Sequence, residues 1–416
     1  MLLLVCSGIS AQDTVRLTLD SCLRYAYGHN LQVRTAVLNQ ESSEVGLTGA
    51  KLRFLPSVSA SASQGWNWGG QSTSAMQYGI NGSLTLFSGL SNLRNLQQSR
   101  SLSEQNALKV QQAENSVAAQ VVQAYLTMLM NEERLTYQQE VLETSRQQKL
   151  EGEVKYQVGR ILESDYMLLE ANYTSAQAEI DNTRLTIEEN RSSLLTLLGM
   201  EPSVRLEVVP SSDSLRAVDR QVIPFDSLLA QAMRTMPDWQ ISQLEVESAR
   251  LSVGLAQSAF LPTVSLGANL GGQWIPDDGN GSESINNSSI SLGVSIPLLN
   301  RGISYTQLKQ SKIALREAEL QNNQTLIDLE NDLQQLHLTA CQALNRYRAT
   351  EALAEAYHAS YEVYVLKYGE GAVTTVEMLQ QQSNYLSALN DYLQNKYTFL
   401  LSEKQLDIYT GKNIAL

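Results

Sequence analysis

The residue types that most often carry chemistry are scarce and scattered in this 416-residue chain. Only three histidines occur, His29, His337 and His358, and each falls in a helix-like pattern. The sequence has no glycine-rich phosphate loop, no nucleophile elbow and no cluster with metal-ligand spacing. The sequence therefore predicts that the protein is not an enzyme and that it uses neither a metal nor a cofactor.

Two further groups of residues suggest chemistry only weakly. The segment 277–281, Asp-Asp-Gly-Asn-Gly, has the composition of a calcium loop but lacks the glutamate that closes such a loop. A solvated external loop is the expected alternative. Cys22 and Cys341 also fall in helix-like patterns without metal-ligand spacing, which favours small buried residues over a disulfide.

The chain repeats itself, and a repeat of this size decides how the fold is interpreted. Phe54-Leu55-Pro56 returns as Phe260-Leu261-Pro262 at an offset of 206, and Lys155-Tyr156 returns as Lys367-Tyr368 at an offset of 212. A constant offset within each stretch indicates duplicated structure with a length difference in between. We expect three segments: repeat 1 at 12–202, a linker at 203–222 and repeat 2 at 223–412.

The first 11 residues predict a secretory signal peptide, because a short apolar run is followed by small residues. The usual basic start is missing, as in a truncated leader. Cys6 leaves lipid attachment open, but the bulky Val5 before it favours cleavage near Ala11.

Long helices are expected because all eight prolines lie at Pro56 or within Pro202–Pro297. Outside that range apolar residues recur every seven positions, which is typical of coiled-coil packing. The rows are Val121, Met128, Leu135 and Leu142; Leu333, Ala340, Tyr347 and Ala354; Tyr173, Ile180, Ile187 and Leu194; Tyr385, Tyr392, Phe399 and Leu406. The predicted helices span about 17–53, 90–153, 161–199, 225–259, 303–366 and 373–410, and the two longest would reach roughly 90 Å.

Two parts of the chain, Phe54–Leu93 and Leu251–Asn300, contain no charged residue apart from Asp277, Asp278 and Glu283, and apolar and small polar residues alternate there. Such alternation predicts transmembrane β-strands within about 56–88 and 262–297. Three tryptophans near the loop ends are candidates for the membrane interface: Trp66, Trp68 and Trp274. A soluble antiparallel sheet is the alternative.

Four strands cannot close a barrel, and open sheet edges are not tolerated in lipid. The strands must therefore be pooled between chains, and a trimer would supply twelve. No apolar stretch is long enough for a transmembrane helix. The net charge of -13 speaks against a nucleic-acid partner.

The order of helix, β-hairpin, long helix, turn and helix, given twice, resembles the TolC-like outer-membrane efflux protein family over about Leu17–Gly411. The motifs that carry the resemblance are Phe54-Leu55-Pro56, Phe260-Leu261-Pro262, Thr85-Leu86-Phe87-Ser88-Gly89, Ser295-Ile296-Pro297-Leu298-Leu299, Tyr156-Gln157-Val158-Gly159 and Tyr368-Gly369-Glu370-Gly371.

This resemblance implies a mainly α-helical protein with membrane β-structure. Duplicated units would form a homotrimeric, 12-stranded β-barrel in outer-membrane lipid, continued by an α-helical coiled-coil barrel in the periplasm. It implies docking to a periplasmic adaptor (membrane fusion) protein and an inner-membrane pump, and passive export in a tripartite efflux or type I secretion system. A structural periplasmic coiled-coil protein without channel activity is the alternative.

The resemblance also assigns residues to the periplasmic end. It places Val158, Gly159 and Gly371 at the tips that meet the adaptor, and Asp165, Tyr368 and Glu377 near the closed aperture. Gln380 and Val373 depart from the family pattern, which expects an acidic and a basic residue there. Acidic residues in a first helical turn also stabilise the helix dipole, so helix capping is an alternative role for Asp165 and Glu377.

Overall fold

A computed structural model describes residues 15–67, 73–209, 222–274 and 285–412. The predicted signal peptide with Cys6, Trp68, the acidic loop 277–281 and most of the linker lie outside the described residues. The chain divides into two compact units. We call Met1–Thr35, Gln111–Met236 and Asp328–Leu416 the helical unit, and Ala36–Val110 and Pro237–Ile327 the sheet unit.

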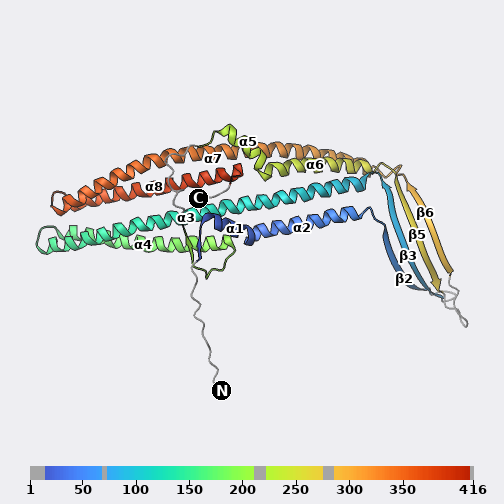
Figure 1. The fold of residues 1–416 in the computed structure, drawn as a ribbon, viewed down its shortest axis with the longest axis horizontal. Coiled ribbons are helices and arrows are strands. Elements are labelled where there is room, and N and C mark those ends of the chain that lie inside the picture. Colours follow the sequence, from blue (N-terminus) through green and yellow to red (C-terminus); the bar gives the residue numbers. More distant parts are fainter. Residues whose placement is uncertain (1–14, 68–72, 210–221, 275–284, 413–416) are drawn as a thin grey trace, which may run out of the picture. The chain divides into compact units, whose positions relative to one another are not determined.

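The long helices come in pairs of equal length. Helices α3 (Ser91–Gln157) and α7 (Ile303–Gly369) have 67 residues each, and α4 (Glu163–Leu198) and α8 (Thr375–Thr410) have 36 each. Figure 1 shows α3 turning back into α4, and α7 into α8, as two antiparallel hairpins. Helices α3 and α7 continue four and three residues beyond their predicted ends.

A glycine in the left-handed conformation follows each of these helices. The φ values of Gly159, Gly199, Gly371 and Gly411 lie between 66° and 77°. At the first, the amide of Gly159 donates to the carbonyl of Tyr156 and that of Arg160 to Lys155, at 2.9 and 2.8 Å. This pair of bonds satisfies carbonyls that the last turn leaves free, and the left-handed backbone strongly favours glycine.

The seven-residue rows form the interior of the helical unit, as the spacing predicted. Most of their members are less than 9% exposed: Val121, Met128, Ile180, Ile187, Leu194, Leu333, Ala340, Tyr347, Ala354, Tyr385, Phe399 and Leu406. Tyr347 and Phe399 pack with Ala343 and Leu344 in one cluster. Burial of one stripe on each helix therefore holds the hairpins together.

The single helix predicted over about 17–53 was wrong. The chain forms a short strand β1 (Val15–Leu17), helix α1 (Leu19–His29) and helix α2 (Leu31–Leu52). Asn30 separates the two helices with an extended backbone, ψ 132°. Its side-chain oxygen accepts the amide of Gln32 at 2.8 Å, and its amide group donates to the carbonyl of Leu197 at 2.8 Å. An asparagine that caps one helix and bonds to another segment stabilises the break.

The single helix predicted over about 225–259 also breaks. Helix α5 (Phe225–Thr235) ends before Met236, and α6 (Pro237–Ser258) begins with proline. A proline disfavours helical backbone in the residue before it but fits the first position of a helix. Pro237 therefore explains the break in physical terms.

A small parallel sheet joins the two ends of the first half of the chain. Strand β1 pairs with β4 (Leu206–Val208), and Arg16 lies opposite Glu207. The hydroxyl of the buried Tyr125 donates to the carbonyl of Val209 at 2.8 Å. Neither strand was predicted, because three residues are too short for a recognisable alternation.

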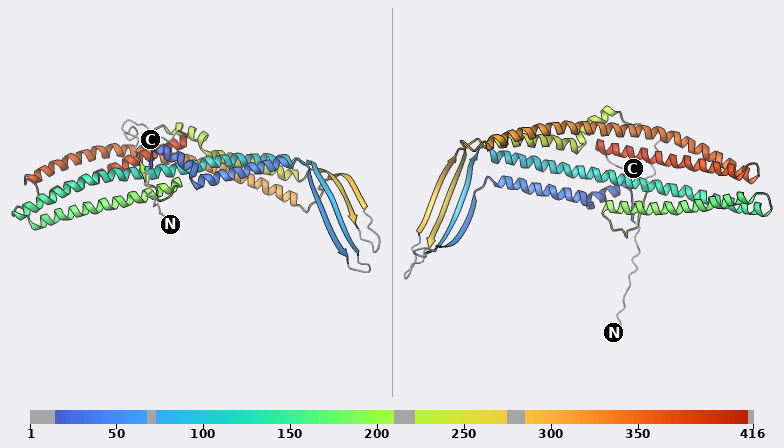
Figure 2. Two further views of the ribbon diagram at one scale, coloured as in Figure 1. Left: turned by 60° about the horizontal axis from the view of Figure 1, so that its bottom comes forward. Right: turned by 180° about the vertical axis from the view of Figure 1, so that it is seen from behind.

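The sheet unit carries a four-stranded antiparallel sheet in the order β2-β3-β5-β6, visible in Figure 2. Its strands are β2 (Ser57–Asn67), β3 (Thr73–Ser88), β5 (Thr263–Trp274) and β6 (Ile285–Ser295). The central β3–β5 pair joins the two predicted repeats, and β2 and β6 are the edges. Among the described helices, none combines the length and apolar character needed to cross a membrane.

Candidate functional site

The register of the sheet gathers its apolar residues on one face, because directly paired residues in an antiparallel sheet point the same way. Ala60 lies opposite Ile80, Ile80 opposite Leu270, and Ala268 opposite Ile290. Several of these side chains are strongly exposed, such as Ile290 at 82% and Ile80 at 51%. The predicted alternation therefore yields one apolar sheet face that no described residue covers.

A bulge in β3 keeps the apolar face continuous to the end of the strand. Thr85 pairs with Ser265, whereas Phe87 pairs with Val264, so one extra residue lies between them. The bulge turns Phe87 to the face of Val264, which pairs with Val294. Uninterrupted alternation along β3 would place Leu86 on this face instead, but the bulge interrupts the two-residue period.

Trp66 and Trp274 lie on this same face and at the same end of the sheet. Trp66 pairs with Ser74, and Trp274 pairs with Met76, two residues further along β3. Their exposed fractions are 59% and 42%. Trp66 and Trp274 are therefore exposed aromatic side chains near the ends of β2 and β5.

The turn between α3 and α4 carries exposed apolar side chains. Val158 is 65% exposed and Leu162, between α3 and α4, is 71% exposed. Leu150 and Val154 extend this row up α3 at four-residue spacing, with 49% and 61% exposure. Gly159 has no atom within 4 Å of a built Cβ, so its left-handed φ, not crowding, requires glycine there.

Tyr368 links the two turns. Its side chain is buried with Leu169 and Met378. The ammonium group of Lys155 lies 4.2 Å from the centre of the Tyr368 ring and donates to the Tyr368 carbonyl at 3.0 Å. The last turn of α3 is thereby joined to the last turn of α7 by a cation–π contact and a charged hydrogen bond.

The two predicted aperture carboxylates have different surroundings. Burial raises the pKa of Tyr368, and the charge of Asp165 adds to this rise, so Asp165 lies near the tyrosine. Glu377 instead caps α8: its carboxylate accepts the amide of Thr374 at 2.8 Å, and Thr374 accepts the amide of Glu377 at 3.2 Å. The Thr374 hydroxyl also donates to the carboxylate at 2.9 Å, and the two bonds that Thr374 donates lower the pKa of the Glu377 carboxyl. Capping therefore accounts for Glu377 locally, whereas Asp165 lies in the first turn of α4, where its charge acts on Tyr368.

Further from the turns, buried polar groups connect the two hairpins. Asn172 on α4 donates to Gln382 on α8 at 2.9 Å, and both donate to the hydroxyl of Ser145 on α3 at 3.1 Å. Gln148 donates to the hydroxyl of Tyr361 at 3.1 Å. Polar side chains that bond to one another across a packed interior fix the register between helices.

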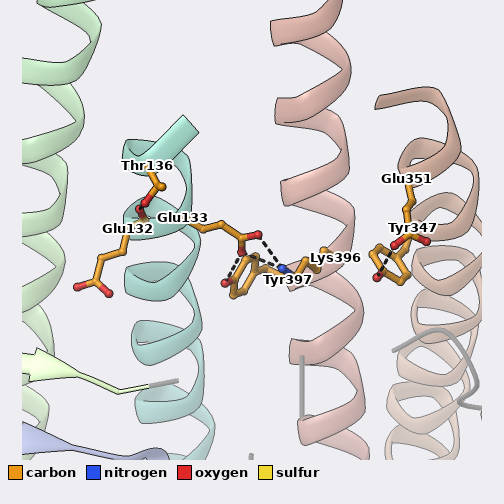
Figure 3. A network of polar contacts seen from close by, with 7 residues as sticks. All are labelled: Glu132, Glu133, Thr136, Tyr347, Glu351, Lys396 and Tyr397. Atoms are coloured by element: carbon orange, nitrogen blue, oxygen red, sulfur yellow. Dashed lines mark hydrogen bonds and ion pairs between the residues drawn. The ribbon is translucent and has the colours of Figure 1, made fainter. Parts of the chain in front are cut away.

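The strongest of these links is a buried ion pair, shown in Figure 3. The ammonium group of Lys396 on α8 lies 2.8 Å from both carboxylate oxygens of Glu133 on α3, and Tyr397 donates to the same carboxylate at 2.8 Å. The Lys396 side chain is 8% exposed and that of Glu133 is 24% exposed. A charge this deeply buried depends on its partner.

Each of the three histidines lies in a helix and has a partner within the helical unit. His29 contacts the carbonyl of Tyr25 at 3.0 Å, His337 contacts the carbonyl of Ile223 at 3.1 Å, and His358 lies 4.0 Å from Glu362. Cys22 is buried and Cys341 partly buried, both as free thiols. Within the described ranges, no group of three or more His, Cys, Asp or Glu residues could hold a metal ion.

Sequence reasoning missed Lys155 and the pair Glu133–Lys396. The repeated Lys-Tyr dipeptide at 155 and 367 was a recognisable feature, but repetition alone does not say that Lys155 reaches Tyr368. Nothing in the sequence connects Glu133 to Lys396, because the two are 263 residues apart.

Known proteins resemble this chain along nearly its whole length. The chain is 21% identical over 418 residues to the outer membrane efflux protein BepC of Brucella suis biovar 1, covering 98% of this chain and 88% of BepC. It is 23% identical to the cation efflux system protein CusC of Escherichia coli O157:H7, covering 92% and 82%. The crystal structure of the Campylobacter jejuni CmeC outer membrane channel superimposes with a TM-score of 0.82 at 19% identity, covering 94% and 85%.

The family model described as outer membrane efflux protein matches residues 23–200 and 228–412, which leaves out only the two ends and the linker region. The solved structure therefore shares the fold of this chain over nearly its whole length. The chain therefore belongs to the outer membrane efflux protein family.

Proposed function

We propose that this protein is the outer-membrane channel of a tripartite efflux or type I secretion system and that it provides passive export. As a family member, it resides in the outer membrane and extends into the periplasm. The observation that carries the proposal is the four-stranded sheet, whose exposed apolar face ends at two edge strands, β2 and β6, each paired on one side only among the described residues. Such a sheet is stable in lipid only when its edges are paired.

Three chains would pair these edges, because β2 of one chain could meet β6 of the next and close a 12-stranded barrel. The apolar face would then contact lipid, and the serine-rich opposite face would line the channel. Contacts such as that between the hydroxyls of Ser57 and Ser83, at 2.8 Å, are typical of a polar lumen face. Trp66 and Trp274 would lie at the outer rim of this barrel.

The trimer is testable by native mass measurement of the purified protein in mild detergent, which should show three chains. In nanodiscs, lipid-attached quenchers at headgroup depth should dim the tryptophan fluorescence. A folded monomer in a bilayer would contradict the shared barrel. Quenching by a water-soluble quencher alone would contradict the rim position of the tryptophans.

The exposed turns support docking of a periplasmic adaptor and, through it, an inner-membrane pump. Val158 and Leu162 expose apolar side chains beside Gly159, and Gly371 forms the matching turn of the second hairpin. Apolar side chains exposed on rigid turns favour contact with another protein. A photoreactive amino acid placed at Val158 should crosslink to an adaptor in cells, and absence of any crosslink there would argue for a different docking surface.

We propose that Asp165, with Tyr368 and Glu377, lines the narrow periplasmic end of the channel. Threefold symmetry would turn the carboxylates into rings, and rings of like charge concentrate counter-ions. The double substitution Asp165→Asn and Glu377→Gln should lower cation selectivity in planar-bilayer recordings, seen as a reversal potential closer to zero under a salt gradient.

The single variants separate this role from capping. Glu377→Gln removes a charge that also caps α8, so a small loss of helix stability is expected of it. Asp165→Asn breaks no side-chain capping bond and loses only the weaker interaction with the helix dipole, so it should change selectivity with a smaller loss of stability. Unchanged selectivity in an intact double-variant trimer would leave both residues as helix-stabilising groups only.

A structural coiled-coil protein without channel activity is the alternative function. The buried seven-residue rows would fit it, but the exposed apolar sheet face would not, since a solvated sheet keeps polar residues outward. Purification decides between the two: the channel requires detergent to stay in solution, and the structural protein does not.

A further inference from the structure

A cavity of about 370 Å³ lies in the helical unit among α3, α7 and α8. Its walls combine aromatic rings with carboxylates, and the side chains that matter for its chemistry are Tyr137, Tyr385, Tyr392, Glu140, Glu351 and Glu355. Tyr385 and Leu389, each 7% exposed, belong to the buried part of the wall. The cavity thus offers apolar contact area together with negative charge.

The charged side chains in the cavity wall are mainly acidic. Burial raises the pKa of Tyr385 to about 12, and the charge of Glu140 contributes to the rise. Burial raises the pKa of Tyr137 as well, and there Glu133 and Glu140 contribute. The lining includes His358 but no lysine or arginine, so the carboxylates are not matched by a permanent positive charge in the wall.

One wall residue already contacts an ammonium group of the chain itself. Lys396, held by Glu133, lies 5.8 Å from the centre of the Tyr392 ring and 5.4 Å from that of Tyr397. The carboxylate of Glu133 and the rings of Tyr392 and Tyr397 therefore together surround a cationic group in this part of the interior. The cavity, which Tyr392 also lines, contains the same kinds of group, namely tyrosine rings and carboxylates.

A metal ion is not the cation that fits. Although His358 and three glutamates line the cavity, they are not among any group of the described residues placed to hold a metal ion. Aromatic walls and separated carboxylates instead suit a larger cation with an apolar body and a diffuse charge, such as a quaternary ammonium compound.

We propose that this cavity is a binding site for amphipathic organic cations, with the rings of Tyr137, Tyr385 and Tyr392 around the apolar body and the carboxylates of Glu140, Glu351 and Glu355 toward the positive charge. With this site, the protein would prefer cationic compounds even without a partner protein. Its significance for export depends on the channel function proposed above, but binding does not, so the two proposals can fail separately.

Isothermal titration of the purified protein in detergent tests the site, with benzyltrimethylammonium as the probe. We expect saturable binding of this cation and none of benzenesulfonate, an anion of similar size. The double substitution Glu140→Gln and Glu355→Gln keeps the shape of two exposed side chains and should weaken binding about tenfold. Tyr385→Leu removes a buried ring and should weaken binding to a similar extent, about tenfold.

A matched control removes the same charge elsewhere. Glu189→Gln with Glu330→Gln, on α4 and α7 outside the cavity lining, should leave the affinity unchanged. Tyr385→Leu alters the buried interior, so Tyr137→Leu, at a half-buried position, serves as a second variant that removes a ring. Circular dichroism checks that both variants keep their helix content. Equal weakening by the control pair, equal binding of the anion, or unchanged affinity in the Glu140 and Glu355 variant would each overturn the site.

Discussion

Replacing Glu133 with glutamine should destabilise the helical unit by about 3–5 kcal/mol, because it leaves the Lys396 ammonium group buried without a counter-charge. Glutamine keeps the size of the side chain and can still accept the hydroxyl of Tyr397, so the change isolates the charge. The measurement is the shift in thermal unfolding followed by far-ultraviolet circular dichroism, on protein purified in the same detergent as the wild type.

A second variant separates the charge effect from simple loss of packing. Adding Lys396→Met to Glu133→Gln removes the stranded ammonium group and should bring stability back to within about 1 kcal/mol of the wild type. If Glu133→Gln alone costs less than about 1 kcal/mol, the ammonium group finds another partner and the pair does not hold α3 to α8.

Replacing Gly89 with alanine should be strongly destabilising for the sheet unit. Gly89, between β3 and α3, has a φ of +62°, and a built Cβ would lie 2.7 Å from the Ser258 carbonyl oxygen and 2.8 Å from the Leu261 Cβ. The left-handed backbone costs alanine about 1–2 kcal/mol. The overlap with backbone adds about 1–3 kcal/mol, since the carbonyl can move only with α6.

Gly302, before α7, is the matched control for this substitution. It has a φ of +78° and no atom within 4 Å of a built Cβ. Gly302→Ala should therefore cost only the backbone term, about 1–2 kcal/mol. Thermal unfolding and the yield of folded protein from the membrane fraction compare the two. Equal effects would mean that the contact with Ser258 relaxes easily and that crowding does not constrain this junction.

The parts of the fold that local periodicity controls were predicted correctly from the sequence. Seven-residue spacing predicted the buried rows on α3, α4, α7 and α8, because a helix buries whichever stripe is apolar. Two-residue alternation in the charge-free segments predicted the faces of β2, β5 and β6, since pairing cannot change which side alternate residues occupy. The bulge near Leu86 changed the end of β3 because it inserts an unpaired residue.

The breaks between α1 and α2 and between α5 and α6 were not predicted from local sequence patterns. Pro237 is a local cause of the second break, but the apolar pattern that continues on both sides of it favoured one long helix. Asn30 could have continued a helix by its own propensity, and it ends α1 because its side chain bonds to the carbonyl of Leu197, far along the chain. A break of that kind depends on the packing of α1 against α4.

The sequence by itself determined the helices, the alternation of the strands and the glycine-terminated turns, because backbone sterics and burial of one face act within a few residues. Only the tertiary structure decided which side chains meet. Lys155 reaches Tyr368, and Glu133 pairs with Lys396, across more than 200 residues of chain. Such pairs form because the hairpins pack in one register, and that register is set by the whole buried interior rather than by any local pattern.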